Sequence, residues 1–116
     1  MSPRTSNVDT TAAMATVTLR RGALYLAAEV YERYFAGLAS VILLRDKNDL
    51  LIMPVRNAAA GGYLLKIRNA RGDRVIDAPD FFRAHAIDRP EEVTLPALWR
   101  ADRAALAIAG LPASAN

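Results

Sequence analysis

The chain has no cysteine, one histidine and one tryptophan in 116 residues. Without cysteine it cannot form a disulfide scaffold, a zinc ribbon or a thiol nucleophile. The lone histidine, His85, cannot hold a metal ion without acidic or thiol partners, and its place on an expected helix favours a structural role. No nucleophile stands beside a base. The sequence therefore predicts a protein that is not an enzyme and that has no cofactor or metal.

Long apolar runs are also lacking. No stretch reaches the roughly 18 apolar residues that a membrane helix needs, and residues Met1 to Met14 lack the apolar core of a secretory signal. The pair Gly61-Gly62 lacks the GxGxxG or Walker pattern of a phosphate-binding loop. These absences predict a cytoplasmic protein without a membrane partner.

What is present is a globular balance, with 53% apolar and 23% charged residues. Residues 1–15 are rich in Ser, Thr, Asn and Ala and are expected to form a flexible arm. Residues 16–110 are expected to form one domain, and residues 111–116 a tail. A domain of this size can stand alone, although a homodimer or higher oligomer would bury more of its surface.

A weak internal repeat organises the domain. An Arg-Gly turn, a short apolar segment, an acidic-aromatic helix start and a second apolar stretch occur once in Arg21–Pro54 and again in Arg71–Ala109. Gly22 aligns with Gly72 at the head of each copy. The repeat predicts an α+β fold of two β-hairpin/helix/β-hairpin units, at about 16–55 and 63–109, that form a small swapped-hairpin-like barrel.

Periodicity places the individual elements. Apolar alternation and β-branched runs predict strands at 17–19, 24–26, 40–44, 50–55, 63–67, 74–77 and 93–95. Helical spacing predicts a helix at 27–36 and a second one starting at Pro79, with 57–62 as the connector between halves. Beyond Pro96 two interpretations stand: a helix at 97–107, or a closing strand at 106–109, which the repeat favours.

Charge is unevenly distributed along the second half. Five bases lie between Arg56 and Arg74 against one acid, Asp73, and the balance reverses from Val75 to Glu92. Cations on a two-stranded ribbon can follow a phosphate backbone. The same pattern also suits a solvated sheet face, or a self-complementary contact between subunits.

The order of elements and the turn residues resemble a known family. Two copies of hairpin, helix and hairpin, with a basic residue and glycine in the first turn, resemble the AbrB/MazE-like superfamily, especially MraZ-type regulators, over residues 16–109. The family motif is Asp-x-Lys-Gly-Arg, then an apolar residue, another residue and a proline. The segment Ala70-Arg71-Gly72-Asp73-Arg74-Val75 keeps base, glycine and arginine with one extra residue. The segment Arg20-Arg21-Gly22-Ala23-Leu24 lacks the later arginine, and neither copy has the proline in its usual place.

Two functions follow as hypotheses. The resemblance and the basic hairpin imply a small non-catalytic DNA-binding transcriptional regulator, in which phosphate is contacted by Arg21, Lys66, Arg68, Arg71 and Arg74. The alternative is a non-catalytic interaction protein, such as an assembly or maturation factor docking on a larger enzyme. Its contacts would be aromatic: Tyr25, Tyr31, Tyr34, Phe35 and Trp99.

Overall fold

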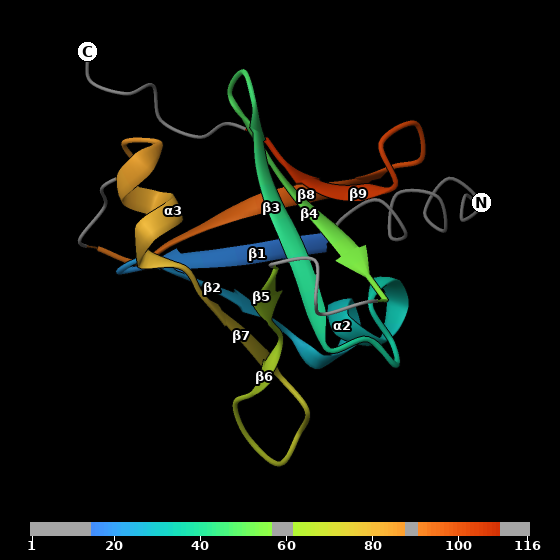
Figure 1. Ribbon diagram of the computed structural model, residues 1–116. Helices are drawn as coiled ribbons and strands as arrows, with labels where there is room; N and C mark the ends of the chain where they lie inside the picture. Colours follow the sequence, from blue (N-terminus) through green and yellow to red (C-terminus); the bar gives the residue numbers. More distant parts are fainter. Residues whose placement is uncertain (1–14, 57–61, 88–90, 110–116) are drawn as a thin grey trace, which may run out of the picture.

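The computed structural model describes residues 15–56, 62–87 and 91–109, which form nine strands and two short helices (Figure 1). The elements are β1 (Ala15–Arg20), β2 (Ala23–Leu26), α2 (Ala28–Tyr34), β3 (Ser40–Asp46), β4 (Asp49–Val55), β5 (Tyr63–Leu64), β6 (Lys66–Ile67), β7 (Arg74–Asp77), α3 (Pro79–Ala84), β8 (Val93–Arg100) and β9 (Ala105–Ile108). Neither helix is long or apolar enough to cross a membrane. The expected arm at 1–15 lies outside the described residues except for Ala15, which is not in an arm but begins β1. The tail at 111–116 and nearly all of the connector also lie outside the described residues.

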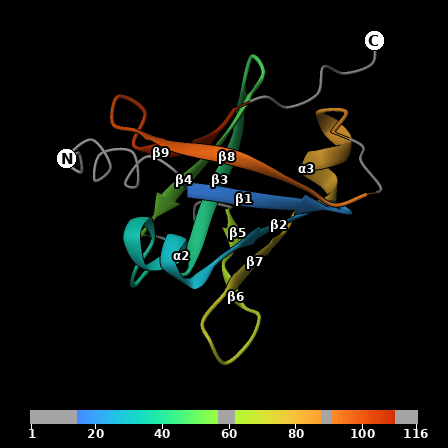
Figure 2. The same cartoon turned by 180° about the vertical axis from the view of Figure 1, so that it is seen from behind.

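All nine strands belong to one antiparallel sheet in the order β5-β3-β4-β9-β8-β1-β2-β7-β6. The two edge strands are consecutive in the chain, because only Leu65 separates β5 from β6. Tyr63 pairs with Val41 on one edge of the sheet, and Lys66 pairs with Val75 on the other. This short segment therefore brings both edges together, and the sheet is a nearly closed barrel with the helices at opposite ends (Figures 1 and 2).

The first hairpin shows how local sequence sets the geometry. Arg20 pairs with Ala23, so the turn between β1 and β2 has only two residues, Arg21 and Gly22. Both have positive φ angles, 50° and 78°, as the favoured two-residue hairpin turn requires. The carbonyl of Gly22 also accepts a hydrogen bond of 2.9 Å from the amide of Ala78, which joins this turn to the start of α3.

The barrel interior is the main core. Along β1 the buried residues alternate with exposed ones, as expected of a strand with one face inward. Val30 and Tyr31 of α2, and Phe81 and Phe82 of α3, bury their side chains in the same cluster. Phe35, directly after α2, is fully buried. The helices thus contribute their apolar faces to the barrel core.

The predicted fold class is wrong, although the predicted elements occur at their expected places. The molecule is mostly antiparallel β, not an α+β fold of two helix-separated units. Its strands interleave: β1 pairs with β8, β2 with β7, and β4 with β9, so each expected half completes its sheet with strands of the other half. A hairpin's apolar pattern shows that one face is buried, but it does not say which distant strand will lie beside it.

The open question at the end of the chain is settled in favour of the strand. Residues 93–100 form β8 and residues 105–108 form β9, with Trp99 paired to Leu106. The other interpretation, a helix at 97–107, is therefore wrong. Every residue of β9 is buried, because Leu106 and Ile108 belong to the main core while Ala105 and Ala107 pack with Leu51 in a second, smaller cluster.

Candidate functional site

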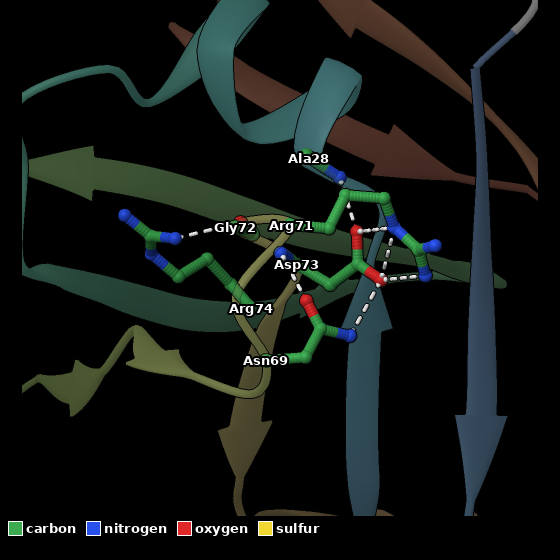
Figure 3. Close-up of polar contacts among 6 residues, drawn as sticks. All are labelled: Ala28, Asn69, Arg71, Gly72, Asp73 and Arg74. Carbon is green, nitrogen blue, oxygen red and sulfur yellow. Dashed lines mark hydrogen bonds and ion pairs between the residues drawn. The ribbon is translucent and has the colours of Figure 1, made fainter.

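The second Arg-Gly turn is organised around a buried carboxylate. Asp73 accepts hydrogen bonds from the side chain of Asn69 (3.0 Å), the guanidinium of Arg71 (2.7 Å) and the backbone amide of Ala28 (2.8 Å), as Figure 3 shows. Its own amide donates to the side-chain oxygen of Asn69 at 3.2 Å. Ala28 is the first residue of α2, so a side chain far along the chain caps this helix.

These contacts all favour the charged form of Asp73. The hydrogen bond from Arg71 is the largest cause that holds the pKa of this carboxyl well below its usual range, followed by those from Asn69 and Ala28. The same pairing raises the pKa of Arg71. The charge of Arg71 is therefore balanced by a carboxylate that also caps a helix.

Arg74 is engaged in the same region. One of its guanidinium nitrogens donates to the carbonyl of Gly72 at 2.6 Å, and its guanidinium carbon lies 3.8 Å from the centre of the Tyr31 ring. Arg71 and Arg74 were both expected to contact phosphate. In the structure Arg71 pairs with Asp73 and Arg74 donates to Gly72, both within the turn (Figure 3). Arg74 also lies against the ring of Tyr31 in α2.

The other predicted cations lie on or beside the outer face of the sheet. Lys66 is half exposed and forms a long ion pair of 3.8 Å with Asp77. Arg68 places its guanidinium over the ring of Tyr25, 4.7 Å from the ring centre. Arg21 is exposed in the β1–β2 turn. Within the described part of the chain, neither Arg21 nor Arg68 has an ion-pair partner.

Arg20 joins this group although the sequence analysis did not select it. Thr18, Arg20, Tyr25, Arg68 and Glu92 line a shallow polar hollow of about 110 Å³. Pairing across the sheet explains the grouping, since Thr18 lies opposite Tyr25 and Arg20 lies two residues further on the same face. The strand alternation of β1 was the signal that could have found Arg20, because Thr18 and Arg20 alternate with buried Val17 and Leu19.

Apart from Tyr25, which lies under the guanidinium of Arg68, the predicted aromatic contacts divide into two groups. Tyr31 and Phe35 belong to the core, and the Tyr31 hydroxyl donates to the carbonyl of Leu38 at 3.1 Å. Both side chains are buried in the core, so neither is exposed for a docking contact. Tyr34 and Trp99 remain partly exposed and stack on each other, with ring centres 5.3 Å apart and an angle of 5° between the rings.

A second hollow lies beside this stacked pair. It has a volume of about 280 Å³, lies between the start of β1 and helix α2, and includes Tyr34 in its lining.

Among the described residues no group of three or more acidic, histidine or cysteine side chains could hold a metal ion. The ring of His85 lies 4.3 Å from that of Phe81, and its carbonyl accepts a hydrogen bond from Arg45.

Comparison with known proteins yields no relative: no family model, no curated protein and no solved structure matches the chain.

Proposed function

We propose that this protein is a small non-catalytic DNA-binding regulator that contacts phosphate through the outer face of β1 and β2, and not through its second Arg-Gly turn. The observation that carries the proposal is the group Arg20, Arg21 and Arg68, which form no ion pair among the described residues and outnumber Glu92, the acid that lines the same hollow. Lys66 lies at the edge of the same face, and its long, exposed ion pair with Asp77 contributes little. Such a regulator would act in the cytoplasm as a homodimer.

The electrostatic reason is counterion release. Each arginine that neutralises a phosphate releases condensed cations from the DNA, so affinity falls steeply with salt. Arg71 already pairs with Asp73, so binding a phosphate would require it to give up a contact that also serves the cap of α2. Arg20 and Arg68 have no such competing ion pair. They are therefore the better phosphate contacts.

Fluorescence anisotropy with a labelled DNA duplex tests the proposal. Duplex affinity should fall between about 50 and 200 mM salt, and the double variant Arg20→Ala/Arg68→Ala should reduce the slope of log K against log salt by about 2. The matched control is Lys47→Asn/Arg56→Ala, which removes two exposed positive charges elsewhere and should keep the wild-type slope. Asparagine is chosen for position 47 because Lys47 has a φ of 60°.

Two results would overturn the DNA proposal. One is the absence of duplex affinity at about 50 mM salt, where non-specific phosphate contacts are strong. The other is equal binding by Arg20→Ala/Arg68→Ala and the wild type. If Arg71→Ala abolished binding in a protein of unchanged stability, the contact surface would instead include the second turn.

A specific observation also favours the second candidate, a non-catalytic interaction protein. Tyr34 and Trp99, two of the expected docking residues, come together from α2 and β8 next to the larger hollow. Stacked aromatic residues with partial exposure are typical of protein contact surfaces.

A further inference from the structure

The smaller hollow lies on the outer face of β1 and β2 and is hereafter called the arginine hollow. Thr18 pairs with Thr94 of β8 on one side and with Tyr25 of β2 on the other, so the floor is a row of side chains across three strands. Its volume of about 110 Å³ is roughly a third of the smallest pockets that enclose whole small molecules. The space therefore suits a single chemical group of a larger ligand. The lining consists of Thr18, Arg20, Tyr25, Arg68 and Glu92.

The guanidinium of Arg68 is held beside this hollow and still has its donors free. It lies over the ring of Tyr25, 4.7 Å from the ring centre. Such stacking uses the flat face of the guanidinium, so the N–H groups at its edge remain available. Within the described part of the chain, the Arg68 side chain forms no hydrogen bond or ion pair. The backbone of the residue is fixed as well, because its amide donates to the carbonyl of Asp73 at 2.8 Å.

Arg20 and Thr18 complete the set of donors. Arg20 lies two residues beyond Thr18 on the same face of β1, is exposed and makes no ion pair among the described residues. The hydroxyl oxygens of Thr18 and Thr94 lie 2.8 Å apart, and when Thr94 donates, the hydrogen of Thr18 is free for an oxygen acceptor in the hollow. Two guanidinium groups outnumber the carboxylate of Glu92 in the lining. The lining therefore favours an anion with several oxygen acceptors.

We propose that the arginine hollow holds one phosphate group, with Arg20 and Arg68 as its donors and Tyr25 as the residue that positions Arg68. A tetrahedral phosphate offers oxygen acceptors in several directions, so two guanidinium groups and a hydroxyl can reach it at once. The inference rests on the proposed function, because a DNA backbone linkage would supply the phosphate, but the site itself can be tested without DNA. Tyr25 then acts on the ligand through Arg68 and not as a docking residue for a protein.

NMR titration of the protein with two small probes tests the site directly. Inorganic phosphate represents the free ion, and dimethyl phosphate represents an internal linkage of the DNA backbone. Each should cause saturable shifts in the side-chain Nε–H signals of Arg20 and Arg68, with little change at Arg56, an exposed arginine outside the hollow. Sodium chloride at the same ionic strength is the control, because screening alone does not saturate at one site. Saturation by dimethyl phosphate assigns the hollow to backbone linkages, whereas saturation by inorganic phosphate alone assigns it to the free ion.

Tyr25→Leu and Tyr25→Phe separate positioning from packing. Leucine removes the ring under Arg68 and should weaken phosphate binding roughly two- to fivefold, the strength of an exposed cation–π contact. Phenylalanine keeps the ring face and should remain within about twofold of the wild type. For duplex DNA, the slope of log K against log salt should stay unchanged in Tyr25→Leu, because Arg68 still pairs with phosphate, whereas Arg68→Ala should lower it by about 1.

Glu92→Gln and Glu32→Gln test whether the charge effect is local. Both remove one negative charge from an exposed side chain, but only Glu92 lines the hollow. Glu92→Gln should therefore strengthen phosphate binding about threefold, as expected for a charge a few ångströms away in water. Glu32→Gln should leave phosphate binding unchanged.

The proposal is overturned if neither probe gives a saturable shift at Arg20 and Arg68, or if Arg56 responds in the same way. It is also overturned if Glu92→Gln and Glu32→Gln have equal effects, and equal phosphate binding by Tyr25→Leu and Tyr25→Phe would remove the positioning role. Because the wild-type titration and Glu92→Gln do not depend on Tyr25→Leu, a folding defect in that variant leaves the test decisive.

The two proposals fail in different ways. Salt-dependent duplex binding without a response at the arginine hollow would refute this site and leave the DNA proposal standing on other contacts. Phosphate binding at the hollow without duplex binding would leave the site standing and refute the DNA proposal.

Discussion

Replacing Leu65 with alanine should destabilise the protein far more than the same change at Leu64. Leu65 is 7% exposed and sits between β5 and β6, where the two edges of the sheet meet, whereas Leu64 is 55% exposed. The substitution removes three buried carbon atoms, or about 2.4 kcal/mol at about 0.8 kcal/mol each. The cavity left behind raises the expected loss to about 3 kcal/mol.

Urea denaturation measures this difference. With a slope of about 1.5 kcal/mol per molar urea, the loss corresponds to a midpoint lowered by about 2 M, whereas Leu64→Ala should change stability by less than about 0.5 kcal/mol. Hydrogen exchange measures the stability of this segment itself, because the amide of Leu65 donates a hydrogen bond of 2.8 Å to the carbonyl of Ala39. That amide should exchange faster in Leu65→Ala. Equal urea midpoints for the two variants would refute the view that this segment closes the barrel core.

Gly62→Ala should be more destabilising than Gly37→Ala in the same assay, because a Cβ at Gly62 would clash with the carbonyl oxygen of Val41. A Cβ at Gly37 has no atom within 4 Å, so this variant should lose only about 1–2 kcal/mol, which is what a φ of 80° costs a residue with a side chain. Asp73→Asn should cost most stability near neutral pH and progressively less below the unfolded pKa of 3.8. The contribution of a lowered carboxyl pKa is fully present above the unfolded value and is lost only as pH falls toward the folded value, which lies well below it. A gap in urea midpoint that does not shrink between about pH 5 and about pH 2 would contradict this. Tyr63→Phe should return the pKa of Asp80 toward its ordinary value, because the 2.8 Å hydrogen bond from Tyr63 is the main cause that lowers it. NMR titration of the carboxyl group measures this change, and an unchanged pKa of Asp80 in the variant would contradict the prediction.

Local elements were predictable because their causes are local. The two-residue turn of Arg21 and Gly22, the proline at the start of α3 and the apolar alternation of β1 all act within a few residues. The order of strands in the sheet was not predictable in this way. It depends on which apolar faces fit together in the barrel, and leucine-rich or alanine-rich strands such as β4 and β9 carry no mark of their neighbours.

The candidate site was predictable only in part, because it too depends on contacts between residues that are far apart in the sequence. Arg68 and Arg21 were recognised from charge, and the structure leaves both without an ion-pair partner in the described part of the chain. The internal pairing of Arg71 was not predictable, because Asp73 looked like the lone acid of a basic segment, whereas its carboxylate accepts hydrogen bonds from both Arg71 and the amide of Ala28. A contact between residues 45 positions apart in the sequence leaves no local pattern.

The two Arg-Gly turns therefore separate into different physical roles. In the second turn a carboxylate and an aromatic ring engage both arginines, so each cation gains its interaction inside the chain and has less to gain from phosphate. In the first turn no acid follows the glycine, and Arg20 and Arg21 keep their charge facing solvent. The charge that a basic turn has available for binding therefore depends on what the fold places beside it, and the letters of the motif do not show this.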